Sequence, residues 1–409
     1  MSIVKNTFAV VGQGYVGLPL AIAAAEAGIT TLGVDLDVEK TTNLNSANSH
    51  IEDITNLRLE NVLKSEKYRA VSSYSELSHI EFIAICVPTP IDENGLPDIS
   101  ILESALKSVG ENMGDGSIVI IESTISPGTT RDVALPILNA ASNGKRFGLV
   151  YSPERIDPAN PTWNVSNTPK LISGIDSESC ERAKDFYSQF VNEIVVGSSV
   201  ESIETAKLLE NTFRLINISF INEFSIFCQK MGLDVREVIE AAGTKPYGFM
   251  KFFPGPGIGG HCIPVDPAYL AAKAKEIGAP THFIDHALEF NHSLGALFAQ
   301  QAQELVGDLV GKQVLLVGVA YKPNVGDVRE TPALPLKAAL TKFGAQILWH
   351  DEKVGTWQGE ASSPLTSEVE LVILVNPHSD IDIAGLMALA AQRGVPVLDT
   401  RGRAISSHS

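Results

Sequence analysis

The chain has 409 residues, a length typical of two or three domains. Lys and Arg number 31 against 48 Asp and Glu, so the formal net charge of −17 argues against a broad basic surface for nucleic acid. The composition, with 44% hydrophobic and 19% charged residues, is that of a globular protein. No apolar run approaches the roughly 18 residues that span a bilayer, so we expect no membrane association.

Four cysteines are present without a CxxC pair, which indicates neither a disulfide framework nor a zinc site. The N-terminal residues enter a strand pattern almost at once and show no signal-peptide pattern. We therefore expect a cytoplasmic protein with reduced thiols.

The first half of the sequence alternates short apolar runs with amphipathic stretches. Helices are predicted at 18–27, 101–113 and 177–190. Buried strands are predicted at 7–11, 31–35, 82–87, 117–122, 148–152, 170–174 and 193–196. Alternation of strand and helix predicts a parallel sheet covered on both faces.

Residues 199–231 contain no Pro or Gly and predict one helix of roughly 45 Å. Its apolar residues recur every three or four positions and share one face: Ile203, Ala206, Leu209, Phe213, Ile216 and Phe220. Such a helix is either the spine between two domains or the seam of a dimer. A second helix at 234–242 starts at an Asp cap, and a Gly/Pro-rich loop at 254–267 precedes a third helix at 281–310.

From Gln313 onward the strand and helix alternation restarts. We predict strands at 314–319, 346–350, 371–375 and 396–399 and a helix at 333–343. These residues form a second, smaller α/β domain, so any duplication in the chain is at the level of domains.

The first chemical motif is Gly12-Gln13-Gly14-Tyr15-Val16-Gly17, between a predicted strand and helix. The first glycine permits a tight turn, the second lets a pyrophosphate approach the backbone, and the third allows close helix–strand packing. Asp35 ends the next strand, where a carboxylate accepts hydrogen bonds from a ribose 2′-hydroxyl and repels a 2′-phosphate. The carboxylate favours NAD over NADP. The alternative to a nucleotide site is a glycine-rich turn that binds no ligand.

Cys262 follows a loop, 253–261, in which six of the nine residues are Gly or Pro and leave little side chain to pack. Such a loop offers backbone N–H groups to an anion and leaves the thiol accessible. A nucleophile and a structural cysteine both remain open from the loop alone. The other three cysteines, Cys86, Cys180 and Cys228, are interpreted as small buried hydrophobes.

Three polar residues add possible acid–base chemistry. Lys207 and Asn211 lie four apart on one helix face and could hold an oxyanion, although a solvated helix face is the common alternative. Asp266 could act as a base for water or simply cap a helix beside Pro267.

Two further patterns are set aside. Tyr247 and Lys251 match a YxxxK spacing, but Pro246, Gly248 and Pro254 break the helix that this motif needs. A metal at His261, Cys262 and Asp266 is not expected, because adjacent residues seldom coordinate one ion and no second ligand pair exists.

Together these motifs resemble the UDP-glucose/GDP-mannose dehydrogenase family of NAD-dependent nucleotide-sugar 6-dehydrogenases. The resemblance extends along essentially the whole chain. In chain order it rests on 12–17, 87–90, 122–124, 127–129, 152–155, 207–214, 259–267, 320–323 and 327–331.

The resemblance implies an α/β protein with an N-terminal Rossmann domain for NAD (1–197), a central helical domain (198–305) and a C-terminal Rossmann-like domain for the UDP-sugar (306–409). The central domain with its long helix would form a homodimer. The implied reaction oxidises the sugar C6 hydroxyl to the acid and reduces two NAD in succession. A cysteine suits this reaction, because a thiohemiacetal retains the aldehyde and the resulting thioester is then hydrolysed.

The resemblance also assigns roles by position. Cys262 matches the nucleophile, Lys207 and Asn211 the oxyanion contacts, and Asp266, with Thr124 placing a water, the base for hydrolysis. Matched catalytic positions are Cys262, Lys207, Asn211, Asp266, Thr124 and Glu154. Matched cofactor positions are Gly12, Gly14, Tyr15, Val16, Gly17, Asp35, Lys40, Thr89, Thr124 and Arg329. Matched substrate positions are Glu154, Arg155, Lys207, Asn211, Arg214, Phe253, Gly255, Gly257, Gly259 and Lys322.

His261 before the nucleophile and Arg214 resemble the branch of the family that oxidises UDP-N-acetylglucosamine or UDP-N-acetylmannosamine, and the stretch 244–246 favours the glucosamine epimer. The alternatives are a UDP-glucose 6-dehydrogenase, a single-step β-hydroxyacid dehydrogenase, and a non-enzymatic NAD-sensing or scaffold protein. The region around Trp163 and Asn164 matches no pattern of the family.

Overall fold

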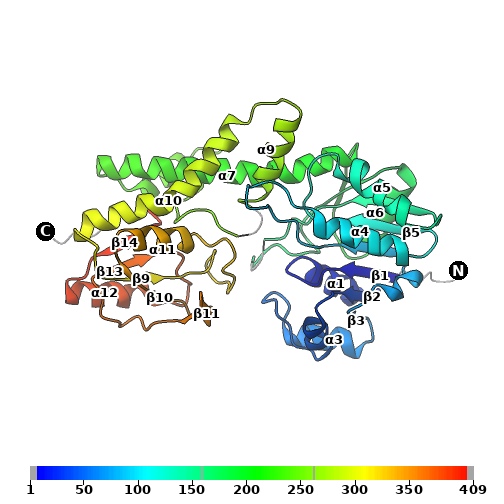
Figure 1. The fold of residues 1–409 in the computed structure, drawn as a ribbon, viewed down its shortest axis with the longest axis horizontal. Helices are drawn as coiled ribbons and strands as arrows, with labels where there is room; N and C mark the ends of the chain where they lie inside the picture. Colours follow the sequence, from blue (N-terminus) through cyan, green and yellow to red (C-terminus); the bar gives the residue numbers. More distant parts are fainter. Residues whose placement is uncertain (1–6, 158–159, 261–262, 403–409) are drawn as a thin grey trace. The chain divides into compact units, whose positions relative to one another are not determined.

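A computed structural model describes residues 7–157, 160–260 and 263–402 (Figure 1). The chain divides into two compact units. The first comprises residues up to Glu210 together with Ala268–Ile277, and the second comprises Asn211–Pro267 and the residues from Gly278 onward. His261 and Cys262, two residues central to the sequence analysis, lie outside the described residues.

The first unit is built on a sheet of eight described strands in the order β3-β2-β1-β4-β5-β6-β7-β8. Their bounds are β1 Thr7–Val11, β2 Thr30–Val34, β3 Tyr68–Val71, β4 Phe82–Ile85, β5 Ser117–Ile121, β6 Phe147–Tyr151, β7 Lys170–Gly174 and β8 Ile194–Val196. The prediction of a parallel sheet is confirmed from β3 to β6 and between β7 and β8, but it is wrong at β6 and β7, which are antiparallel. The described residues between these two strands form no crossover helix, which a parallel connection would need.

Helices cover both faces of this sheet (Figure 1). Along β1, Phe8 and Val10 belong to one hydrophobic cluster, whereas Ala9 and Val11 belong to the other. The first cluster includes residues of α1 (Gly17–Glu26), α3 (Asn56–Lys64) and α6 (Ser177–Tyr187), and the second includes residues of α4 (Ser100–Asn112) and α5 (Leu135–Ala141). The predicted α/β fold is therefore confirmed, with α2 (Val38–Asn45), α3 and β3 as additions that the sequence analysis missed.

The predicted long helix is α7, Val200–Met231, with 32 residues. The apolar residues predicted to share one face differ in burial, and Ile203 near the start of α7 is 6% exposed. Farther along, Leu209, Phe213 and Phe220 are 59%, 44% and 60% exposed. One side of this helix thus presents large apolar side chains to solvent.

The helices predicted at 234–242 and 281–310 begin within one residue of their expected starts, whereas a helix near Asp266 was considered only as an alternative role for that residue. The α8 helix, Val235–Ala242, begins at Asp234, whose carboxylate accepts a hydrogen bond from the Arg236 N–H. The α9 helix, Asp266–Glu276, begins in this unit and continues into the first. The α10 helix, His282–Val306, ends earlier than predicted, because the backbone turns at Gly307 with φ of 74°.

A second parallel sheet has the order β10-β9-β13-β14. Its strands are β9 Gln313–Val317, β10 Gln346–His350, β13 Leu371–Leu374 and β14 Val397–Asp399. The α11 helix, Ala333–Lys342, agrees with the prediction, whereas α12, Ile383–Arg393, and the short hairpin of β11 (Thr356–Trp357) and β12 (Glu360–Ala361) were not predicted. The strand order repeats β2-β1-β4-β5 of the first unit, so the two Rossmann-like sheets share one topology.

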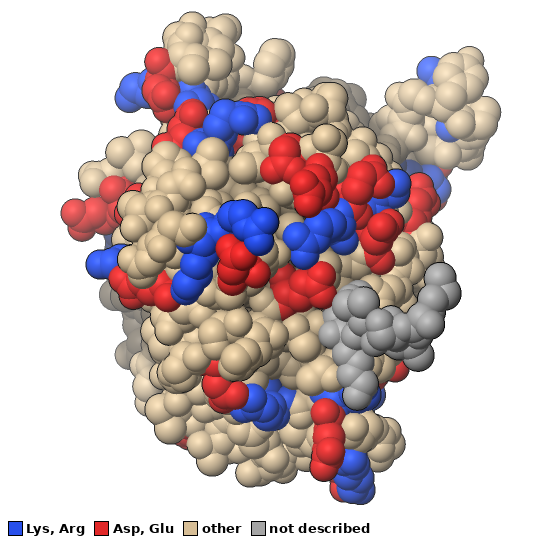
Figure 2. Space-filling model, turned by 90° about the vertical axis from the view of Figure 1, so that its right-hand side faces the viewer, with Lys and Arg blue, Asp and Glu red and all other residues tan. Residues whose placement is uncertain are grey.

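Two surface properties agree with the composition. Among the described helices none has the length and apolarity of a membrane span. On the face of the molecule shown in Figure 2, acidic and basic side chains are intermixed and form no continuous basic patch.

Candidate active site

The glycine motif forms a tight turn between β1 and α1. Gly12 has φ of 90°, and a Cβ there would lie 2.6 Å from the carbonyl oxygen of Cys86. A Cβ on Gly17 would lie 1.8 Å from the carbonyl oxygen of Gly12, so only glycine allows the helix to start this close to the strand. At Gly14 a Cβ would meet nothing within 4 Å. The turn therefore leaves open space beside the backbone where a pyrophosphate would fit.

Asp35, directly after β2, is fixed against this turn. Its Oδ2 accepts hydrogen bonds from the Gln13 N–H at 2.9 Å and from Lys40 Nζ at 2.8 Å, and its Oδ1 accepts the Asp37 N–H at 3.1 Å. Burial alone would raise the pKa of Asp35, but these hydrogen bonds, with Lys40 foremost, hold the pKa below its ordinary value. Asp35 is thus an ionised carboxylate that could accept a hydrogen bond from a ribose hydroxyl, and Lys40 is its counter-ion.

Gln13 is a positioning residue that the sequence analysis did not single out. Its side chain is fully buried, donates from Nε2 to the Val10 carbonyl at 2.7 Å and accepts the Tyr68 hydroxyl at 2.8 Å. A Cβ on Gly33 would lie 2.6 Å from Gln13 Oε1 and 2.6 Å from the Tyr68 hydroxyl oxygen. The glycine inside β2 was the available signal, since glycine in a strand marks a close approach.

Three other predicted residues follow β4, β5 and β6 at the same edge of the sheet. Thr89 is 4% exposed, and the Tyr269 hydroxyl donates to its carbonyl oxygen at 3.1 Å. Thr124 is partly buried, and the Glu154 carboxylate accepts the N–H groups of Arg155 and Ile156. The carboxyl ends of parallel strands are where ligands bind in open α/β sheets.

A buried ion pair lies under this edge and was not predicted. Lys170 Nζ is 2.8 Å from Glu122 Oε2, with side chains 7% and 0% exposed, and Tyr187 donates its hydroxyl to the same carboxylate. Burial tends to lower the pKa of Lys170, but Glu122 and Glu154 outweigh it, so the pKa is raised. The pair fixes the strand end that leads directly into Thr124.

The basic residues of the first unit are also held in place. Lys207 on α7 is 8% exposed, which excludes the solvated helix face as the explanation for this lysine. Arg155 Nη2 lies 2.7 Å from Glu210 Oε1, and its Nη1 donates to the Pro169 carbonyl at 2.6 Å.

In the second unit Asn211 and Asp266 are in direct contact. Asn211 Nδ2 donates to Asp266 Oδ2 at 2.5 Å, and Asp266 is 2% exposed at the start of α9. Asn211 lies one helical turn after Lys207 along α7. A buried carboxylate held by an amide is suited to accept a proton from a positioned water.

The glycine-rich loop that leads toward Cys262 is fixed by two asparagines. The Gly255 N–H donates to Asn222 Oδ1 at 2.8 Å, and Ile258 exchanges two hydrogen bonds with the Asn291 side chain, at 2.7 and 3.2 Å. Neither asparagine was predicted, because nothing in the sequence links them to the loop. Gly257 has φ of 128°, a conformation that other residues rarely adopt.

The remaining predicted contacts are on the surface or in loops. Arg214 is exposed on α7, and Phe253 is 37% exposed with the Arg236 guanidinium 5.1 Å from its ring centre. Lys322 is partly buried in the loop after β9, and Arg329 is paired with Asp327 at 2.6 Å. Within 7–157, 160–260 and 263–402, no group of three His, Cys, Asp or Glu side chains could hold a metal ion.

Comparison with known proteins agrees with this geometry. The chain matches three domains of the UDP-glucose/GDP-mannose dehydrogenase family: the NAD binding domain over residues 6–191, the central domain over 201–293 and the UDP binding domain over 315–404. It is 35% identical to a UDP-N-acetyl-D-glucosamine 6-dehydrogenase of Pseudomonas aeruginosa, covering 83% of this chain and 81% of that protein.

Two further matches are archaeal. The chain is 35% identical to a UDP-N-acetyl-D-mannosamine dehydrogenase of Pyrococcus horikoshii, covering 91% of this chain and 89% of that protein. A solved structure of the UDP-N-acetylmannosamine dehydrogenase from P. horikoshii superposes with a TM-score of 0.88 at 31% identity, covering 97% and 95% of the two chains. The chain therefore belongs to the UDP-glucose/GDP-mannose dehydrogenase family, and its N-terminal sheet is that family's NAD-binding domain.

Proposed function

We propose that this protein oxidises the C6 hydroxyl of a UDP-N-acetylhexosamine, UDP-N-acetylglucosamine or UDP-N-acetylmannosamine, to the carboxylic acid with NAD as oxidant. The names of the relatives at 35% identity support this class of substrate. The observation that carries the proposal is the buried Asp266 carboxylate, which Asn211 holds at 2.5 Å four residues after Cys262.

The roles follow from the chemistry of each group. NAD bound at the glycine turn supplies the hydride acceptor. After the first oxidation, the Cys262 thiolate adds to the C6 aldehyde, and the thiohemiacetal that forms loses the second hydride to become a thioester. Lys207 and Asn211 stabilise the oxyanions at C6. Asp266 takes a proton from water placed by Thr124, and hydrolysis releases the acid and restores the thiol.

The other site residues keep the roles that the family resemblance gives them. The cofactor contacts are Gly12, Gly14, Tyr15, Val16, Gly17, Asp35, Lys40, Thr89, Thr124 and Arg329. The substrate contacts are Glu154, Arg155, Arg214, 253–259 and Lys322. We retain the domain boundaries after residues 197 and 305. A cytoplasmic location is supported by the free thiols of Cys86, Cys180 and Cys228 within the described chain.

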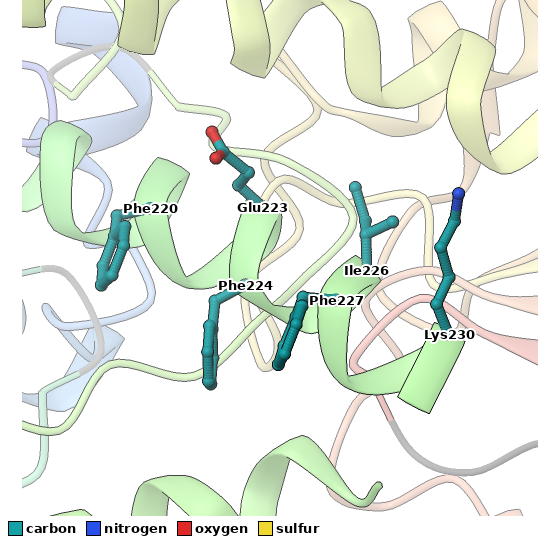
Figure 3. A pocket seen from close by; sticks show the side chains of 6 residues that line it. All are labelled: Phe220, Glu223, Phe224, Ile226, Phe227 and Lys230. Atoms are coloured by element: carbon teal, nitrogen blue, oxygen red, sulfur yellow. The ribbon is translucent and has the colours of Figure 1, made fainter. Parts of the chain in front are cut away.

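We also propose a homodimer formed through α7. Figure 3 shows Phe220, Phe224 and Phe227 projecting from one side of this helix and lining a shallow groove. Phe220 and Phe227 are 60% and 55% exposed, and ring centres of successive aromatics lie 6.3 and 5.7 Å apart. A contiguous exposed aromatic stripe of this kind is typical of an interface. In a two-fold dimer the stripe of one protomer would pack against the same stripe of its partner.

The first prediction is the stoichiometry. Purified protein should form two NADH per molecule of UDP-N-acetylglucosamine or UDP-N-acetylmannosamine, and it should use UDP-glucose and GDP-mannose less efficiently. Absorbance at 340 nm with limiting sugar measures this. One NADH per sugar would favour the single-step dehydrogenase, and no turnover with any UDP-sugar would favour the sensor or scaffold.

The second prediction concerns Asp35. Loss of the ribose hydrogen bond and repulsion of a 2′-phosphate should favour NAD over NADP by about 2 kcal/mol, or roughly 30-fold in kcat/KM. Asp35→Ala should remove most of this preference. Lys40→Met is the matched control: it removes the counter-ion of the carboxylate and should widen the preference. Equal use of both cofactors by the unmodified protein would contradict the proposed role.

The third prediction concerns Cys262. Cys262→Ser should bind NAD and UDP-sugar normally but accumulate a covalent sugar adduct, because an ester hydrolyses more slowly than a thioester. Cys262→Ala should show no adduct in intact mass spectra, and Asp266→Asn should slow hydrolysis more than the first hydride transfer. Cys180→Ala, which changes a buried thiol of α6, should turn over normally. Full two-NADH turnover by Cys262→Ala would refute the covalent mechanism.

The fourth prediction concerns the aromatic stripe. The unmodified chain should scatter light as a particle of twice its 43.8 kDa mass, and the double variant Phe220→Glu/Phe227→Glu should be monomeric. Phe283→Glu, at a residue of α10 that is 81% exposed and not on the stripe, should remain dimeric. A 43.8 kDa particle for the unmodified chain at micromolar concentration would exclude the dimer.

A further inference from the structure

The second sheet repeats the turn that forms the NAD site in the first. Gly318 follows β9 with φ of 80°, as Gly12 follows β1 with φ of 90°, and each donates its N–H to the last residue of the neighbouring strand at 2.8 Å. The next N–H then donates to an aspartate, from Gln13 to Asp35 and from Val319 to Asp351, at 2.9 Å in both cases.

The two aspartates differ in what surrounds them. Asp35 has the Lys40 side chain, itself 28% exposed, on one oxygen, whereas the Asp351 side chain is fully buried. Asp351 accepts hydrogen bonds from the N–H groups of Val319, Ala320, Lys353 and Val354, at 2.9 to 3.2 Å, and from His378 Nε2 at 2.7 Å. These donors occupy both oxygens, so Asp351 has no position left for a ribose hydroxyl.

Burial alone would raise the pKa of Asp351, but the His378 and backbone hydrogen bonds hold it below its ordinary value, so the carboxylate is ionised. A buried carboxylate that accepts this many hydrogen bonds fixes the positions of the backbone segments and the side chain that donate them. The Val319 and Ala320 donors belong to the loop that continues into Lys322.

His378 joins this carboxylate to the far end of the same loop. Its Nδ1 accepts the Asn324 N–H at 2.8 Å, so the ring proton is on Nε2 and points to Asp351. Asn324 has φ of 68°, and its Oδ1 accepts both the N–H and the hydroxyl of Ser379 at 2.9 Å. Asn376 Nδ2 donates to the carbonyl oxygens of Ala320 and Tyr321 at 3.0 and 3.1 Å. Residues 319–324 are thereby held at both ends and in the middle.

The same loop supports the glycine-rich loop of the second unit. A Cβ on Gly260 would lie 2.8 Å from the Tyr321 ring, and a Cβ on Gly259 would lie 3.1 Å from the Tyr321 Cβ. A displacement of Tyr321 would therefore disturb the loop at 253–259, which is assigned to the substrate.

We propose that Asp351, His378 and Asn376 are positioning residues that hold the 319–324 loop in the conformation that binds the UDP part of the substrate. This inference rests on the proposed function, because it assigns the loop with Lys322 to the UDP-sugar. The turn at Gly12 serves a ribose, whereas the turn at Gly318 would serve as a rigid support for the loop that binds the nucleotide sugar.

The test uses the full chain and UDP itself as probe. His378→Leu removes both ring hydrogen bonds and should weaken UDP binding, measured by titration calorimetry, about tenfold, the effect of one or two lost hydrogen bonds. The KM for the UDP-sugar should rise in parallel, while kcat at saturation and the KM for NAD should change less than twofold. His378→Gln, which keeps one donor and one acceptor, should recover part of the UDP affinity.

Two further variants separate positioning from general stability. Thr400→Val removes a buried hydroxyl that donates to the Leu374 carbonyl at 2.9 Å in the same sheet, and it should lower the unfolding midpoint without changing the UDP affinity. Asn324→Gly keeps the φ of 68° accessible and removes only the Ser379 contacts, so it should fold even if His378→Leu does not and weaken UDP binding about threefold.

The outcomes are distinct. If Thr400→Val weakens UDP binding as much as His378→Leu, or if folded His378→Leu and Asn324→Gly bind UDP normally, the positioning role is refuted while the proposed function stands. If the unmodified chain binds neither UDP nor a UDP-sugar, the proposed function fails, and this inference fails with it.

Discussion

Both halves of this protein depend on one kind of hydrogen bond. In each half, a glycine follows the first strand of the sheet, and the N–H of the next residue donates to an aspartate that follows the second strand. It occurs between Gln13 and Asp35 and again between Val319 and Asp351, at the same N···O distance of 2.9 Å. In each case a charge-assisted bond fixes the direction in which the chain leaves the sheet, and the loop that leaves there is the one assigned to a nucleotide. The remaining site elements are placed relative to these two turns within their own units.

The two copies differ in how the aspartate is used. In the first, the turn leads directly into α1, and the open space at Gly14 together with the partly exposed Lys40 leaves room for a ligand. In the second, His378 and four backbone amides saturate the carboxylate, and within the described residues no helix follows Gly318 until α11 begins at Ala333. Two sheets with the same strand order thus use the same turn differently, the first for a dinucleotide and the second, as we propose, as a support, so function resides in the sites and not in the fold.

Residues whose partners are near in sequence, or whose role is imposed by backbone geometry, were predictable. The glycines at 12 and 17, the Asp234 helix cap and the strand β10 belong to this class, because local sterics and periodicity decide them. The antiparallel β7 was not predictable, because its run of apolar residues looks the same in either direction. Asn222, Asn291 and His378 were missed because each acts on a loop more than 25 residues away, and a polar residue in a helix or loop gives no sign of that partner.

We expect only the first of the two glycine turns to accept a dinucleotide. Titration calorimetry of the full chain with NADH tests it most directly, with Asp35→Ala and unmodified protein measured side by side. One NADH should bind per chain, Asp35→Ala should bind it markedly more weakly, and UDP should not compete with it. Two equivalents of NADH per chain, or unchanged affinity in Asp35→Ala, would contradict this expectation.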